Sequence, residues 1–170
     1  MTGTTTLTLG GLLAALLVLA ANLHPWWTGN RDPKLLAPFG KGFTAAACAA
    51  ACPSGLLGWA HSRTGTVANG AGERTSAVAS GTTTGSGLTS GQLVGLGSTG
   101  AIVAVLIVFI VSLAYKKASK ADRRRIIGGA FVGSVLLLTA GVAGALSWLP
   151  DVLNTTGAVL VDTVQGVGLL

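Results

Sequence analysis

Long uncharged stretches alternate with short polar segments along this chain. The first covers residues 7–23, and two more cover residues 93–115 and 126–149. A helix needs about 17 to 25 mostly apolar residues to cross a bilayer, and each stretch has this length. The β-branched residues of 93–115 would favour a strand in water, but the length of the run indicates a membrane helix. The pattern predicts an all-α membrane protein: a transmembrane helical hairpin preceded by an N-terminal hydrophobic helix.

The composition supports lipid as the solvent of these stretches. Of the 170 residues, 50% are hydrophobic and only 9% are charged, whereas soluble domains carry about 25% charged residues. Mean hydropathy is +0.69. So few charges cannot cover a surface that faces water on all sides.

The N-terminal segment, residues 1–27, has two interpretations: a retained transmembrane anchor or a cleaved signal peptide. No Lys or Arg precedes the apolar run, which argues against a signal, but Val18, Leu19 and Ala20 offer a small-residue cleavage site. Trp26 and Trp27 end the run. A tryptophan pair there is typical of an aromatic belt at the membrane interface, and the alternative is a ligand-binding aromatic pair.

The middle of the chain is rich in small residues. Residues 28–60 are expected to lie outside the cytoplasm or at the interface, with Cys48 and Cys52 as packing residues. Residues 61–92 consist mainly of Gly, Ser, Thr and Ala, which bury too little apolar surface to offset the entropy of ordering. They are predicted to form a flexible linker or a long extracytoplasmic loop. Residues 150–170 are predicted to form an amphipathic tail at the interface.

The chain has a net charge of +6. Most of the positive charge lies in the loop that joins the two helices of the predicted hairpin, which covers residues 93–149. Six of the eleven Lys and Arg residues lie in the loop 116–125, and short loops rich in Lys and Arg are cytoplasmic. A retained first span would then place the N-terminus in the cytoplasm and residues 24–92 outside. The loop is either a topology signal or a binding site for an anionic partner, lipid headgroups or nucleic acid. The contacts of such a site would be Lys116, Lys117, Lys120, Arg123, Arg124 and Arg125.

The sequence contains no recognisable catalytic constellation. The only histidines, His24 and His61, fall in predicted loops, and neither hairpin helix carries an ionisable residue that would indicate a transport or proton pathway. Two cysteines without neighbouring histidines do not form a metal site. We therefore expect no enzyme, no metal and no cofactor other than bound phospholipid.

Small residues on the last predicted span indicate close helix packing. Gly129 and Gly133 form one small-xxx-small pair, and Ala140 and Gly144 form another. Such faces let helix backbones approach closely in lipid. The pairs serve either packing within the hairpin or packing between copies of the chain, which would make it a homo-oligomer.

Small residues, a flexible outer segment, a helical hairpin and a basic inner loop together resemble the major pilins of type IV secretion and conjugation systems. The resemblance covers residues 92–149. It implies a self-assembling subunit, in the cell membrane or in an extracellular filament, with lipid bound between subunits. Residues 116–125 would line the lumen and meet lipid headgroups or DNA in transit, and secretion-system proteins would be partners.

Two other classes of membrane protein fit the same pattern. One is a holin-like pore-forming protein, although the charged C-terminal tail usual in that class is absent here. The other is an accessory subunit that anchors a larger complex in the membrane.

Overall fold

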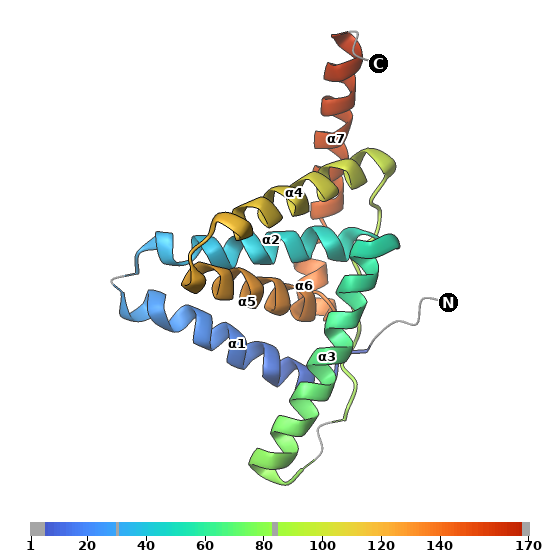
Figure 1. The fold of residues 1–170 in the computed structure, drawn as a ribbon. Coiled ribbons are helices and arrows are strands. Elements are labelled where there is room, and N and C mark those ends of the chain that lie inside the picture. The colour runs from blue at the N-terminus through green and yellow to red at the C-terminus, as the bar shows by residue number, and fades with distance from the viewer. Residues whose placement is uncertain (1–5, 30, 83–84, 168–170) are drawn as a thin grey trace.

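Helices make up most of the chain (Figure 1). The computed structural model describes residues 6–29, 31–82 and 85–167, and over these residues the predicted all-helical class is confirmed. Residues 1–5, 30, 83–84 and 168–170, which belong to the predicted N-terminal segment, small-residue segment, linker and tail, lie outside the described residues. In chain order the elements are α1 (Leu9–Thr28), the 3-10 helix η1 (Pro33–Leu35), α2 (Ala37–Ala51), α3 (Gly55–Ser80), α4 (Ser98–Lys117), α5 (Lys120–Leu136), α6 (Ala140–Ala145) and α7 (Leu149–Gly166).

Two helices, α1 and α4, are each long and apolar enough to cross a membrane. Within the chain, only 22% of the tested stretch of α1 and 17% of that of α4 is buried. Large apolar side chains such as Leu17 and Phe109 are exposed instead. The helices α2 and α3 pass the same test only as a pair, bent by 111°. The described residues therefore hold two candidate spans, or three if this bent pair is one span.

The second predicted hairpin helix, residues 126–149, is not continuous in the structure. It is divided into α5, α6 and the start of α7. The break follows from Thr139, whose Oγ1 donates to the carbonyl of Leu136 at 2.6 Å and accepts from the N–H of Val142 at 3.4 Å. This hydroxyl closes the end of α5 and caps the start of α6. The hydropathy of residues 126–149 does not reveal such a break, because the run is uninterrupted by charged residues.

The predicted hairpin partners α4 and α5 are joined by a tight turn, but α5 packs mainly on α2 and α1. Across the molecule α1 packs on α5, α5 on α2, and α2 on α4. Figure 1 shows these four helices side by side, with α3 and α7 running across them. The central pair, α2 and α5, holds the molecule together.

Glycines allow the backbones of α2 and α5 to touch. A Cβ atom on Gly42 would overlap the backbone of Ile126, and one on Gly129 would overlap the backbone of Phe39. One turn further along α5, Gly133 meets Ala46 of α2. Residues later in α2 contact residues later in α5. The two helices therefore run parallel.

The crossing helix α3 is fixed to the start of α1 by Asn69. Its side-chain Oδ1 accepts from the N–H of Thr8 at 2.9 Å, and its Nδ2 donates to the carbonyl of Thr6 at 2.8 Å. One turn later, Gly72 lies against the backbone of Gly10 and Gly11, where a Cβ would overlap both. This contact requires glycine on α3.

The crossing helix α7 is fixed to the start of α4 in the same way. Asn154 accepts through Oδ1 from the N–H of Gly97 at 2.8 Å and donates through Nδ2 to the carbonyl of Gly95 at 2.8 Å. Gly157 then lies against the backbone of Thr99 and Gly100. The two contacts share one arrangement. In each, the Asn of an Asn-x-x-Gly sequence on the crossing helix hydrogen-bonds the backbone just before an apolar helix, and the Gly packs against the first turn of that helix.

The chain therefore contains an internal structural repeat. The unit α1–α2–α3 corresponds to α4–α5 followed by α6 and α7, and the contacts of one half recur in the other: α1 packs on α5 as α4 packs on α2. Because α2 and α5 run parallel, the halves point the same way. In this respect the two halves resemble the parallel repeats of some membrane proteins.

Most of the predicted flexible linker, residues 61–92, is ordered. Residues 61–80 belong to α3, which is held by its contacts with α1. The segment that follows pairs with both halves: the N–H of Leu88 donates to the carbonyl of Leu7 at 2.7 Å, and the N–H of Gly91 to the carbonyl of Leu138 at 2.8 Å. Tertiary contacts thus order a segment whose composition favours flexibility.

Candidate functional site

The predicted basic loop is a tight turn between two helices. Lys116 and Lys117 end α4, whereas Lys120 and the three arginines lie in the first turns of α5. Ser119 caps α5, because its Oγ accepts from the N–H of Asp122 at 3.2 Å. The six predicted contact residues are therefore presented by two helix ends.

Two of the six make contacts inside the chain. Arg123 donates to the carbonyls of Tyr115 and Lys116 at 3.1 and 2.6 Å, which satisfies carbonyl groups at the C-terminus of α4. Arg125 donates to the carbonyl of Leu35 at 3.4 Å and lies 3.9 Å from Asp122. That is the one ion pair in the described part of the chain, so these two arginines contribute to the local structure.

The other four cations, Lys116, Lys117, Lys120 and Arg124, are exposed. In the described residues no carboxylate lies within ion-pair distance of any of them. They form an unpaired positive surface.

The connection between α1 and α2 lies at the same end of the molecule, which the Arg125–Leu35 hydrogen bond shows directly. It adds two exposed cations, Lys34 and Arg31, the latter lying 5.0 Å from the ring centroid of Trp27. The sequence analysis placed residues 24–92 and the basic loop on opposite sides of the membrane, whereas in the structure the α1–α2 and α4–α5 connections lie at the same end of the molecule. Both connections belong to one face.

The predicted packing residues have separate surroundings. Gly129 and Gly133 contact α2 within the chain, and Ala140 lies against Gly91 of the connecting segment. Gly144 has open space around it. The close packing of α5 is thus with α2, a partner that the sequence analysis did not consider.

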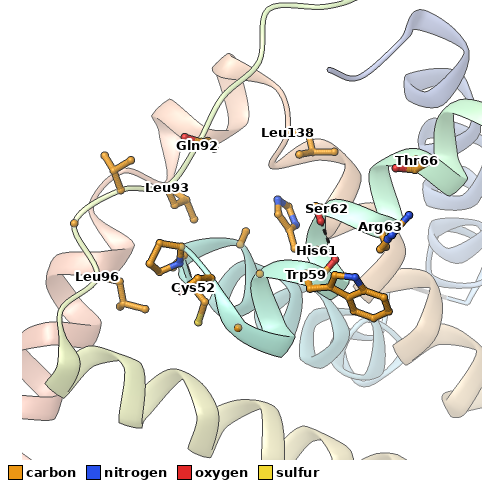
Figure 2. A pocket seen from close by; sticks show the side chains of 18 residues that line it. Cys52, Trp59, His61, Ser62, Arg63, Thr66, Gln92, Leu93, Leu96 and Leu138 are labelled. Atoms are coloured by element: carbon orange, nitrogen blue, oxygen red, sulfur yellow. Dashed lines mark hydrogen bonds between the residues drawn. The ribbon is translucent and has the colours of Figure 1, made fainter. Parts of the chain in front are cut away.

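A cavity of about 710 Å³ lies at the other end of the molecule, where α2 bends into α3 (Figure 2). Its apolar wall includes Leu93, Leu96 and Leu138. Its polar lining includes His61 and Arg63 of α3. Figure 2 shows the His61 ring directed toward Leu138, across from the segment with Gln92 and Leu93. The lining contains no Asp or Glu.

The Nδ1 atom of His61 is buried and has no hydrogen-bond partner among the described residues. Burial also lowers the pKa of this side chain, because a charged imidazolium is poorly solvated there. His61 additionally lines a smaller, mainly apolar cavity of about 370 Å³ between α2, α3, α4 and α5. Sequence analysis missed this site because it assigned His61 to a flexible linker.

Comparisons with protein-family models, with curated proteins and with solved structures gave no match for this chain. No group of three or more His, Cys, Asp or Glu side chains positioned to hold a metal ion occurs in the described residues.

Proposed function

We propose that this chain is a small multi-pass integral membrane protein, not an enzyme, that anchors a larger complex in the membrane. The observation that carries the proposal is the gathering of Arg31 and Lys34 with the cations of residues 116–125 on one face. Short connections rich in Lys and Arg stay in the cytoplasm. That face is the cytoplasmic one, and the start of α1, α3 and α7 lie on the opposite side.

The exposed surface supports a membrane location. Side chains such as Leu17, Phe109 and Ile110 project from the outer faces of α1 and α4, and exposed apolar area of this extent is unfavourable in water. Lipid tails covering α1 and α4 on both flanks of the central α2–α5 pair account for it.

An anchoring role is favoured over self-assembly by the packing of α5. The self-assembly hypothesis uses Gly129 and Gly133 for contacts between copies, but these glycines contact α2 of the same chain. Exposed, unpaired cations on a rigid pair of turns suit an acidic cytoplasmic partner. The pilin-like and holin-like functions stay predictions.

Cysteine accessibility tests the topology. Single cysteines at Lys34, Lys120, Thr75 and Asp162, introduced after replacing Cys48 and Cys52 with alanine, are treated with a membrane-impermeant maleimide on intact cells. Positions 75 and 162 should react, whereas 34 and 120 should react only after permeabilisation. Labelling of 34 but not 120 on intact cells would contradict the proposal.

Size-exclusion chromatography with light scattering, and negative-stain imaging of protein in mild detergent, separate anchoring from self-assembly. An anchor subunit purified alone should be a monomer or small oligomer. Filaments would favour the pilin hypothesis, and large regular rings the pore-forming one.

A further inference from the structure

The smaller cavity, of about 370 Å³, is a groove on one flank of the molecule. It forms because α4 and α5 both pack on α2 and hardly on each other. Its floor is α2, with Ala45 and Ala49, and its walls are Val108 of α4 and Ile127 and Phe131 of α5. The first part of α3 closes the end away from the basic turns. We call this cavity the lateral groove.

The corresponding flank of the other half is filled. The reciprocal contacts of Gly42 and Gly129 make these two glycines equivalent positions, and in the same register Lys41 of α2 corresponds to Gly128 of α5. Gly128 is buried, and the side chain of Asn22 from α1 lies directly over it. Lys41 is exposed. A face that α1 covers on α5 is therefore open on α2.

Two exposed cations stand at the end of the lateral groove that is nearer the basic turns. Lys41 precedes Ala45 by four residues on α2, and Arg124 precedes Ile127 by three residues on α5, so each shares a helix face with residues of the groove. Neither cation has a carboxylate within ion-pair distance in the described chain. The register of α2 on α5 places them about one helical turn apart along the helix axes.

The dimensions of the groove favour a narrow chain over a helix. Its volume of about 370 Å³ is less than that of a single turn of α-helix, roughly 420 Å³ for a cylinder about 10 Å wide and 5.4 Å long. A helix from a second copy therefore does not fit. Ile127 at its edge is exposed, so in the proposed membrane location the groove opens toward lipid.

Lysine inside a membrane helix is costly unless its ammonium group reaches the interface or an anion. Lys41 lies one turn inside α2 and has no acidic partner in the described chain. An apolar groove that ends at two unpaired cations matches a molecule with an apolar chain and an anionic head.

We propose that the lateral groove binds one acyl chain of an anionic phospholipid from the leaflet on the side of the basic turns. Its phosphodiester is held by Lys41 and Arg124, since Lys and Arg are the residues that bind phosphate groups. The site lies within one chain, between α2, α4 and α5. It rests on the proposed membrane location and does not depend on the anchoring role.

The test uses the full chain in dodecyl maltoside, titrated with phosphatidylglycerol or with phosphatidylcholine of the same acyl chains and followed by native mass spectrometry. A basic residue near an anionic lipid contributes about fivefold in affinity, so phosphatidylglycerol should bind about 25-fold more tightly than phosphatidylcholine. Glycerol 3-phosphate, which has no chain, should not compete. Equal affinity for the two lipids, or efficient competition by glycerol 3-phosphate, would overturn the proposal.

Variants of the cations assign the headgroup contact. Lys41→Gln and Arg124→Gln should each weaken binding of phosphatidylglycerol by about fivefold and leave binding of phosphatidylcholine unchanged. The matched control is Lys117→Gln, since Lys117 is exposed, follows Val108 by nine residues and so lies on the opposite face of α4. An equal loss in Lys117→Gln would show unspecific attraction to the basic turns and contradict the assignment.

Variants of the floor assign the chain contact. Ala45→Phe fills the groove and should weaken binding of both lipids by at least about tenfold, and Ala49→Leu serves as a smaller second variant. The melting temperature of each variant checks that the fold is kept. Unchanged lipid binding in either folded variant would refute the groove as the site. Binding in detergent does not depend on membrane orientation, so cysteine labelling that reverses the proposed topology and a failure to bind lipid are separate results.

Discussion

The two asparagine contacts offer a quantitative test of the internal repeat. Asn69→Ala removes three hydrogen bonds, two of them accepted from Thr8 and one donated to Thr6. Asn154→Ala removes two, with Gly97 and Gly95. At roughly 1 kcal/mol net for each bond, unfolding becomes easier by about 3 kcal/mol for Asn69→Ala and about 2 kcal/mol for Asn154→Ala.

For a chain of this size, 1 kcal/mol corresponds to roughly 2 to 4 °C in the melting temperature. The expected decreases are therefore about 9 °C for Asn69→Ala and about 6 °C for Asn154→Ala. The assay is thermal unfolding in mild detergent, followed by circular dichroism and by the loss of the monodisperse peak in size-exclusion chromatography.

Matched controls lie on the same two helices. The hydroxyls of Thr75 and Thr155 donate only to carbonyls four residues back in their own helix, each at 2.9 Å. Their alanine variants should change the melting temperature by no more than about 2 °C, as exposed substitutions usually do. If Asn154→Ala behaved like Thr155→Ala while Asn69→Ala was destabilising, the two contacts would not be equivalent and the repeat would be wrong.

Three further predictions concern other parts of the molecule. Gly42→Leu should destabilise the chain by more than about 2 kcal/mol, because the side chain would overlap α5, whereas Gly40→Leu, which faces open space, should not; chemical denaturation compares them. Arg123→Gln loses two backbone hydrogen bonds but, because Arg123 is exposed to water, should lower the melting temperature by only about 3 °C, half the decrease for Asn154→Ala, and Arg124→Gln should leave it unchanged. Cys48, which is fully buried, should resist a maleimide in the folded protein and react after denaturation.

The sequence predicted the helical class and the two most apolar helices because these depend on composition and run length alone. It did not predict that residues 126–149 are interrupted, since the interruption depends on one hydroxyl, that of Thr139, and on pairing with a distant segment. It also assigned residues 61–80 to a linker, because α3 is held by glycine and asparagine contacts with α1 and not by apolar burial of its own.

The candidate sites also divide into features that the sequence reveals and features that depend on tertiary contacts. The six cations of the basic turn are visible in sequence because they are contiguous. The contribution of Arg31 and Lys34 and the cavity at His61 require the fold. The repeat left one trace in the sequence, the Asn-x-x-Gly of residues 69–72 and 154–157. Four residues with two fixed positions are too short a pattern to establish a duplication without coordinates.

The parallel orientation of the two halves has a consequence for how such a chain is assembled in a membrane. In the proposed topology each half starts and ends on the same side of the bilayer, so the second half inserts in the same sense as the first. Nothing in the second half then has to be inverted, and in that topology the charge bias of each turn reinforces the other. A single chain thereby contains both partners of the α2–α5 contact, which two separate subunits would have to form by association.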